Sequence, residues 1–429
     1  MDLWRLTMRI CTFPNCAYLS ETSRMIALYK EMKNRGVDVV MATHGGPYEW
    51  LFKDEGIDYT VVEPHFTDER AKEFVLTNTG EKGLSEFYSE AELDQHVANE
   101  IAFFEKENIK KVITGFTLSC AISARATGIS YYVTHLGSFV PPVFERKMLV
   151  PTLVLNLKIF KLIPKLWLVT MINNLMFKSK LNTNSFNKVA VKYGVKPFMS
   201  MEEMMMGDTA VVTDVPEILT IPKEELEAWK PSEKYKKYYN HPGKLRYGGA
   251  LYSMLFGEVS DEVKTFLDTN KPKIYVALTS GQSDVISRVY EGVKDMDAKI
   301  IVVTTVHHIK ETSHDNVLFV DHLPAHKVMP MVDVAIIHGG QGSVQTAIAS
   351  GTPIVGIPLH VEQGLNVAMV EKHGAGIMQT KHDIDSHDIL EKVERILKDP
   401  FYKKNMMKLS EYQNSVDGVK NTVDVILGQ

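Results

Sequence analysis

The segment VDVAIIHGGQGSVQTAIASGTPIVGIPLHVEQGLN, from Val332 to Asn366, carries most of the information about the fold. Near its start is an apolar run, 334–337, that is typical of a buried parallel strand, and His338 follows this run. Three glycines follow the run, and a helical pattern then extends from about Ser343 to the glycine at 351. A strand, a glycine-rich turn and a helix in this order can bind a diphosphate, although such turns also follow strands for purely structural reasons.

The same alternation of strands and helices extends in both directions from this segment. Further strands are expected at 9–13, 37–43, 112–114, 131–134, 273–278, 299–304, 317–320 and 354–357, with helices near 23–35 and 118–127. Two such series predict two doubly wound α/β domains with parallel sheets. Glycines and a proline between His241 and Gly249 mark the junction, so we expect domains at 1–249 and 250–406. A last helix, 407–429, is expected to cross back to the first domain.

Composition narrows the function class. The chain has 429 residues and a formal net charge of -5, so no global basic field favours nucleic acid as a partner. Its three cysteines show neither metal-binding nor redox spacing, which predicts buried thiols in a reducing compartment. The first thirteen residues lack the features of a secretory signal, and no stretch of eighteen apolar residues occurs. We therefore expect a cytoplasmic protein that acts on a small molecule.

Charge is segregated between Arg146 and Ser200, where ten Lys or Arg and no Asp or Glu occur. Within this segment, Lys158, Lys161 and Lys165 fall on one face of an expected helix, which Pro164 would kink. Two interpretations remain open. The helices line an acceptor pocket and carry solvated lysines, or they form a peripheral membrane surface that meets anionic lipid.

Eleven residues between His338 and Asn366 fit, at matching spacing, the donor motif H-G-G-x-G-S-x-x-E-A-x-x-x-G-x-P-x-x-x-x-P-x-x-x-D-Q-x-x-N. The matching residues are His338, Gly339, Gly340, Gly342, Ser343, Ala347, Gly351, Pro353, Pro358, Gln363 and Asn366. The chain thus resembles the UDP-glycosyltransferase family of inverting enzymes with the GT-B fold, in which two Rossmann-like domains face a central cleft. The resemblance implies that His338, with Gly340, Gly342 and Ser343, holds the diphosphate. It also implies that Glu362 and Gln363 bind the sugar hydroxyls.

Two weaker matches lie upstream in the same half. The stretch 277–283 resembles the family's loop beside the phosphates, with Thr279, Gly281 and Gln282 as the implied contacts. The stretch 319–333 resembles the segment that receives the nucleobase, where His322 and Leu323 stand at the stacking position. A surface-loop role for His322 is the alternative.

The first half lacks the reactive residues that the family usually carries. The base position of the family's first loop is occupied by Tyr18, and the position of its orienting aspartate corresponds to Gly115 or Phe116. Another proton acceptor must serve an ordinary alcohol acceptor. We expect Glu21, in the same loop, or His135, after the strand 131–134, to act as the base, with Tyr18 shaping the pocket. An easily ionised acceptor such as a phenol is the alternative.

The function implied is inverting transfer of a hexose from a nucleotide diphosphate sugar, with a UDP-sugar favoured, to a hydroxyl of a small-molecule or lipid acceptor. No metal or cofactor is implied, since the segment 332–366 holds no aspartate pair and the helix terminus can take the phosphate charge. Alternatives are a catalytically silent partner that activates a true transferase, and a sugar-nucleotide epimerase of the same fold. The sequence leaves the sugar, the acceptor and the oligomeric state open.

Overall fold

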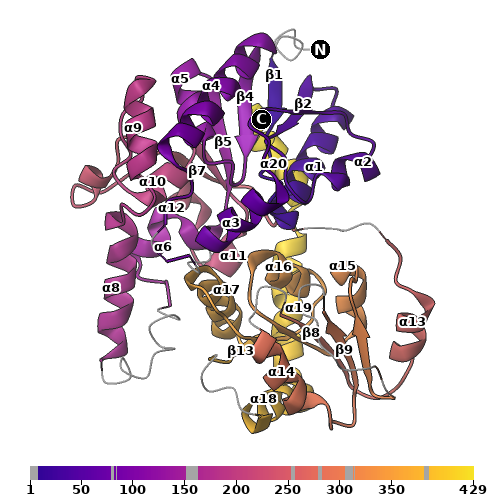
Figure 1. Cartoon of the computed structure of the whole chain (residues 1–429). Coiled ribbons are helices and arrows are strands. Elements are labelled where there is room, and N and C mark those ends of the chain that lie inside the picture. The colour runs from indigo at the N-terminus through magenta and orange to yellow at the C-terminus, as the bar shows by residue number, and fades with distance from the viewer. Residues whose placement is uncertain are drawn as a thin grey trace.

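The structure is a computed structural model, and it describes residues 8–78, 82–83, 85–150, 163–252, 257–278, 283–304, 313, 315–380 and 386–429. Figure 1 shows two α/β halves, one above the other, each with a central sheet between layers of helices. Within the described ranges, every strand pair is parallel. The α/β class predicted from the sequence is therefore confirmed.

The first sheet has the strand order β3-β2-β1-β4-β5-β6-β7. Its strands are β1 (Arg9–Thr12), β2 (Val39–Thr43), β3 (Tyr59–Val61), β4 (Ile109–Thr114), β5 (Ser130–His135), β6 (Thr209–Val212) and β7 (Lys244–Tyr247). The second sheet has the order β10-β9-β8-β11-β12-β13. Its strands are β8 (Lys273–Ala277), β9 (Lys299–Val303), β10 (Val317–Val320), β11 (Val334–Ile337), β12 (Ile354–Gly356) and β13 (Gly376–Met378). Central strands such as β11 are buried throughout, as their continuous apolar sequence requires.

Helices cover both faces of each sheet. Those associated with the first sheet are α1 (Leu19–Asn34), α2 (Trp50–Asp54), α3 (Asp68–Asn78), α4 (Glu90–Lys106), α5 (Cys120–Thr127), η2 (Gly137–Phe139), α6 (Pro141–Glu145), α8 (Lys165–Lys178), α9 (Asn184–Lys192), α10 (Met201–Met205), α11 (Pro216–Leu219), α12 (Lys223–Glu227) and η4 (Lys236–Tyr238). Those that follow are α13 (Asp261–Leu267), α14 (Ser283–Val293), α15 (Ala325–Val328), η5 (Met329–Met331), α16 (Gln341–Ala349), α17 (Val361–Lys372), α18 (Ser386–Lys398), α19 (Pro400–Asn414) and α20 (Gly418–Leu427).

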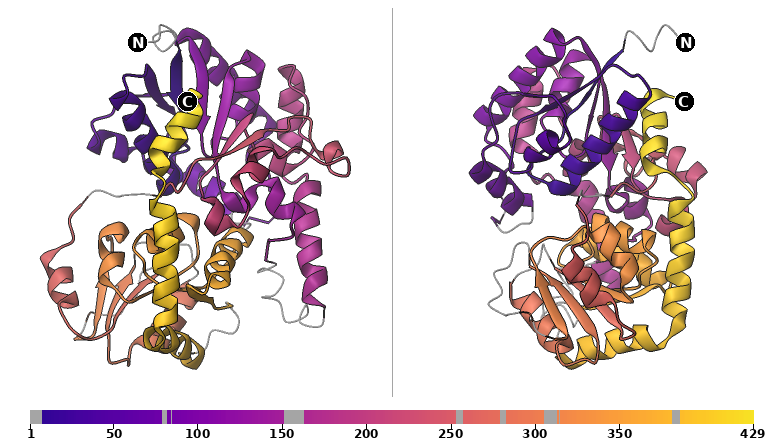
Figure 2. Two further views of the ribbon diagram at one scale, coloured as in Figure 1. Left: turned by 180° about the vertical axis from the view of Figure 1, so that it is seen from behind. Right: turned by 90° about the vertical axis from the view of Figure 1, so that its right-hand side faces the viewer.

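The end of the chain differs from the single helix expected at 407–429. It forms two helices, α19 and α20, separated at Ser415–Asp417, because the Asp417 side chain caps a new helix by accepting a hydrogen bond from the Lys420 amide. Figure 2 shows α19 lying along the second half and α20 along the first. There α20 packs against α1, and Asp424 forms an ion pair with Arg35.

Two other expectations need correction. The first helix begins at Leu19 rather than near Ser23, so Glu21 belongs to its first turn and not to a loop. The residues expected to form a basic helix, Lys158 and Lys161 with their apolar neighbours Ile159 and Leu162, lie outside the described residues. The three cysteines are free and buried, as expected. Within the described part of the chain, no helix has the length and hydropathy needed to cross a bilayer.

Candidate active site

The strand orders locate the regions where ligands bind in doubly wound sheets. Such ligands lie beyond the carboxyl ends of the strands, at the point where the strand order changes direction. That point lies between β1 and β4 in the first sheet and between β8 and β11 in the second. The loops concerned are those after β1 and β4, which carry Asn15 and Gly115, and the turn after β11, which carries His338.

The turn after β11 leads directly into α16, whose first-turn amides point away from the helix body. The Gln341 amide donates to Glu362 Oε1 at 3.1 Å. In the described part of the chain, no protein group accepts a hydrogen bond from the amides of Gly342 or Ser343. A Cβ atom placed on Gly342 would meet nothing within 4 Å. Two free donors, the positive end of the helix dipole and open space therefore coincide at this turn.

His338 lies beside the same turn and is only 6% exposed. A Cβ atom on Gly340 would come within 2.6 Å of His338 Nε2, so the bare glycine is what lets the ring lie there. Gly339 has a φ of +87°, a backbone conformation that side chains disfavour. Burial lowers the pKa of His338 to about 4, although a hydrogen bond with the Ala277 backbone opposes this, so the imidazole is neutral at pH 7.

Glu362 and Gln363 lie in the first turn of α17, across from the start of α16. Glu362 Oε1 also accepts from Asn366 Nδ2 at 2.6 Å, and Asn366 is held by the Gly339 carbonyl at 3.0 Å. Gln363 Oε1 accepts from the Leu359 amide at 2.8 Å. Among the described residues, Glu362 Oε2 and Gln363 Nε2 have no hydrogen-bond partner, which leaves one acceptor and one donor for a ligand. Burial raises the pKa of Glu362 to about 7.

Of the remaining residues expected at the donor site, some lie outside the described ranges and others are described. Thr279, Gly281 and Gln282 lie outside the described residues. His322 is exposed and Leu323 is half-buried, in the connection between β10 and α15 at the carboxyl edge of the second sheet. Thr346, where the donor motif quoted above has a glutamate, donates its hydroxyl hydrogen to the Gly342 carbonyl at 2.8 Å. That hydroxyl therefore bonds back to the carbonyl one turn earlier in its own helix.

In the first half, Glu21 is 1% exposed and joins two loops. Its Oε1 atom accepts hydrogen bonds from the amides of Asn15 at 3.0 Å, Gly115 at 3.0 Å and Phe116 at 2.7 Å, and Oε2 is buried without a partner. Burial raises the pKa of Glu21, and the amide hydrogen bonds oppose this rise. Tyr18 lies at the start of α1 with its ring edge-on to Phe116, 5.6 Å between centroids.

His135 ends β5, at the same edge of the first sheet. Its Nδ1 atom lies 3.1 Å from the Leu136 carbonyl oxygen, so Nδ1 carries the hydrogen and Nε2 keeps its lone pair in the neutral ring. Burial lowers the pKa of His135, which keeps the ring neutral at pH 7. Within the described residues no group bonds Nε2.

Arg24 is a member of the site that the sequence did not point to. It lies in α1, one turn after Glu21, and its Nε atom is buried without a hydrogen-bond partner. Burial lowers the pKa of Arg24, while the charges of Glu21 and Glu362 oppose this. The Arg24 charge in turn contributes to the lowered pKa of His135. These four side chains, from both halves of the molecule, are therefore within electrostatic reach of one another.

Direct contacts hold the two halves together beside this group. Thr213, after β6, donates its hydroxyl hydrogen to Gln341 Oε1 at 3.1 Å. The side-chain amides of Gln341 and Gln345 donate to the Thr213 carbonyl at 2.9 Å and 2.5 Å. Gln341 stands at the unspecified position x of the motif H-G-G-x-G-S. It thus fixes the start of α16 against the first half.

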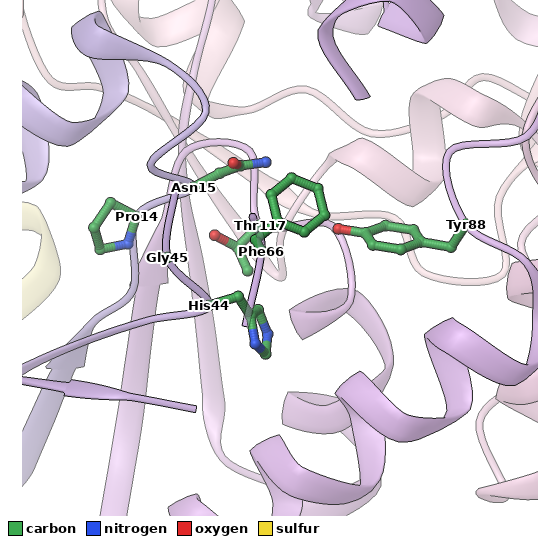
Figure 3. Close-up of a pocket in the computed structure, with 7 residues that line it drawn as sticks. All are labelled: Pro14, Asn15, His44, Gly45, Phe66, Tyr88 and Thr117. Atoms are coloured by element: carbon green, nitrogen blue, oxygen red, sulfur yellow. The ribbon is translucent and has the colours of Figure 1, made fainter. Parts of the chain in front are cut away.

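A small pocket opens beside the loops after β1 and β4 in the first half (Figure 3). It is lined by Pro14, Asn15, His44, Gly45, Phe66, Tyr88 and Thr117, and the hydroxyl end of Tyr88 points toward the Phe66 ring. Both His44 nitrogens are engaged, Nδ1 with the Val62 carbonyl at 2.7 Å and Nε2 with Glu100 at 2.7 Å. His44 is therefore a wall of the pocket rather than a free proton acceptor.

With this geometry described, known proteins provide the comparison. Residues 287–421 match the family model of the erythromycin biosynthesis protein CIII-like C-terminal domain. A PGL/p-HBAD biosynthesis glycosyltransferase of Mycobacterium tuberculosis is 23% identical over 333 residues, covering 76% of this chain and 72% of that protein. These matches support an assignment of the chain to the UDP-glycosyltransferase family.

Solved structures agree with this family assignment at the level of the fold. The glycosyltransferase VinC, in complex with DTDP, aligns over 98% of this chain and 99% of its own, with 17% identity and a TM-score of 0.64. UGT2 of Phytolacca americana, complexed with UDP-2fluoro-glucose and pterostilbene, aligns over 98% of this chain and 99% of its own, with 12% identity and a TM-score of 0.66. The GT-B fold expected from the sequence is thereby confirmed. The relatives and the solved structures together support glycosyl transfer as the reaction class.

Proposed function

We propose that this glycosyltransferase moves a hexose from a nucleotide diphosphate sugar to a hydroxyl of a small-molecule or lipid acceptor, with inversion. The observation that carries the proposal is the start of α16, where the free amides of Gly342 and Ser343 meet the neutral ring of His338 beside open space. A diphosphate suits such a site, since it accepts several hydrogen bonds and is stabilised by the helix dipole.

Glu362 and Gln363 would hold the sugar. The free Oε2 of Glu362 accepts from one hydroxyl, and the free Nε2 of Gln363 donates to a neighbouring one. We favour UDP as the carrier, as in the complex named for the Phytolacca protein, with TDP as the carrier to test beside it.

The reaction would be a single displacement at the anomeric carbon. The acceptor oxygen forms the new bond to that carbon, while the bond from the carbon to the diphosphate oxygen breaks and its electron pair leaves with the phosphate. The α16 amides, His338 and the Arg24 cation would stabilise the growing negative charge. Arg24 fits this role because it acts electrostatically on Glu362, which itself bonds the first amide of α16.

We further propose His135 as the base that takes the acceptor proton. It has a neutral ring whose Nε2 lone pair no described residue uses, and this arrangement suits a proton acceptor. Glu21 suits the role less well than its position in sequence suggested, because its Oε1 holds three amides and its Oε2 is buried. Its carboxylate fills the space beside Gly115, where a Cβ atom would lie 3.0 Å from Glu21 Cδ. Glu21 therefore supports the site from the place where relatives carry their aspartate.

Nucleotide binding and donor hydrolysis test the proposal. UDP should raise the melting temperature of the purified protein, and His338→Ala should weaken this binding by about 1–3 kcal/mol, as expected for a hydrogen bond to a charged group. His65→Ala, which alters an exposed histidine of the first half, is the matched control and should bind UDP as the native protein does. If neither UDP nor TDP at millimolar concentration shifts melting, the donor-site assignment is wrong.

A catalytically silent partner of a true transferase is the second candidate. The observation that favours it is Tyr18 at the usual base position, with its ring packed against Phe116. Hydrolysis or transfer with a panel of nucleotide sugars separates the two functions. A protein that binds UDP tightly but turns over no sugar nucleotide, alone or with acceptors, would be the silent partner.

A further inference from the structure

Helix α8 is fixed to the first half by one face only. Leu168 and Phe177 are 2% and 1% exposed, and the Phe177 ring stacks on Tyr235 with 4.2 Å between centroids. The buried Asn173 side chain bonds both the amide and the carbonyl of Leu149, at 3.1 Å and 3.2 Å. The helix is therefore held in place, and Figure 1 shows it at the edge of the molecule, projecting downward beside the second half.

The opposite face of α8 is apolar and exposed. Trp167, Met171 and Leu175, which we call the α8 stripe, recur every four residues and therefore lie along one side of the helix. They are 75%, 50% and 51% exposed, and Leu166 beside them is 70% exposed. A firmly held helix that presents large apolar side chains in a row marks an interaction surface.

The charges near the stripe separate into two groups. Lys188 and Lys192 of α9 are neutralised by ion pairs with Glu90 and Asp94 of α4, so the segment 146–200 is not one continuous basic face. Lys178 and Lys180, at the end of α8, are exposed and form no ion pair with any described residue. Two lysines without an ion pair to any described residue therefore lie at the carboxyl end of the α8 stripe.

We propose that the α8 stripe docks on the surface of a bilayer that contains anionic lipid. Tryptophan and aliphatic side chains insert at the boundary between headgroups and acyl chains, while nearby lysines are attracted to anionic headgroups. A second copy of the chain is a poorer partner, because a symmetric contact sets the same surface against itself, and the segment 146–200 offers no Asp or Glu to pair with Lys178 and Lys180. The proposal goes beyond the transferase reaction, since docking requires no nucleotide sugar.

Vesicle flotation with the full-length protein tests the proposal. Phosphatidylcholine vesicles with and without phosphatidylglycerol should bind it differently, with binding to the anionic vesicles lost as salt is raised. Trp167→Ser/Met171→Ser/Leu175→Ser should weaken binding to the anionic vesicles about tenfold or more. Trp50→Ser, which alters a tryptophan of α2 that is 49% exposed, should leave binding unchanged.

Charge variants and fluorescence complete the design. Lys178→Glu/Lys180→Glu should abolish the preference for anionic vesicles, whereas the matched change at two exposed lysines of α19, Lys403→Glu/Lys404→Glu, should not. Brominated lipid should quench the native protein more than Trp167→Phe, a change that leaves the fold intact. Equal flotation of the native protein and the triple-serine variant, or equal quenching of native and Trp167→Phe, would overturn the proposal. So would a triple-serine variant that loses self-association in sedimentation but still floats.

Discussion

Replacing Gly342 by alanine should separate nucleotide binding from folding. The added Cβ atom meets nothing within 4 Å in the ligand-free protein, and Gly342 lies in α16, where alanine is the better helix former. We therefore expect a stability that is unchanged or higher by up to about 1 kcal/mol. The same methyl group enters the space beside the free amides, which a diphosphate must approach closely.

The expected loss of nucleotide binding can be expressed as a change in the free energy of unfolding. A nucleotide present at about 100 times its dissociation constant stabilises the native protein by about 2.7 kcal/mol. If the methyl group weakens binding about tenfold, the same nucleotide concentration stabilises Gly342→Ala by only about 1.4 kcal/mol. Thermal unfolding with and without UDP measures both quantities, and titration calorimetry gives the dissociation constants directly.

Two further variants make the comparison sharper. Gly340→Ala should lose both stability and nucleotide binding, because its Cβ atom would lie 2.6 Å from His338 Nε2 and displace the buried ring. Ser350→Ala, at the other end of α16, should change neither. Native UDP affinity in Gly342→Ala would refute the reasoning, since no diphosphate could then lie against this turn.

Three other predictions concern the first half of the molecule. His135→Ala should lower turnover about a hundredfold or more, and Glu21→Gln should lower it less. The activity of the native protein should fall at acid pH, because protonation of His135 at its lowered pKa removes the proton acceptor. Initial rates between pH 4 and pH 8 measure this fall. Arg24→Ala should reduce both turnover and the UDP melting shift, with partial recovery in Arg24→Lys, and unchanged kinetics in both would exclude a role for this cation. Burial raises the pKa of Glu202 from 4.5 to about 8, so the free energy of unfolding declines as the pH rises from about 4.5 to about 8. Glu202→Gln should flatten this decline, which is at most about 3 kcal/mol between pH 6 and pH 9, in denaturant unfolding at those two pH values.

Local sequence signals were sufficient for the second half. The strand β11 and the turn after it follow from a continuous apolar run and a glycine at φ +87°, and both signals lie within a few residues. The start of α1 was misjudged because its N-cap residue, Tyr18, makes no side-chain capping hydrogen bond. The break between α19 and α20 was missed, although Asp417 before Gly418 is a recognisable capping signal.

The members of the site that were missed depend on contacts between distant segments. Nothing near Arg24 in the sequence indicates that it comes within electrostatic reach of Glu362, because that distance is set by how the two halves pack. The same holds for Thr213 and Gln341, which are 128 residues apart. Periodicity identifies which face of a helix is buried, but it does not identify the partner that buries it.

The first half lacks the usual reactive residues at their usual positions, but it carries other polar groups, Glu21 and His135, at the same edge of the sheet. The resemblance implies a carboxylate at the end of β4, at the position of Gly115 or Phe116, and here the space beside Gly115 is filled by Glu21 from α1. A buried carboxylate is costly unless it is hydrogen-bonded, and the three amides that Glu21 accepts from explain why the fold tolerates it. Because the Glu21 carboxylate already accepts hydrogen bonds from amides of the loops after β1 and β4, a proton acceptor has to come from the end of another strand. His135 fits this requirement, since it stands at the carboxyl edge of β5 with Nδ1 fixed and Nε2 unused by the described residues.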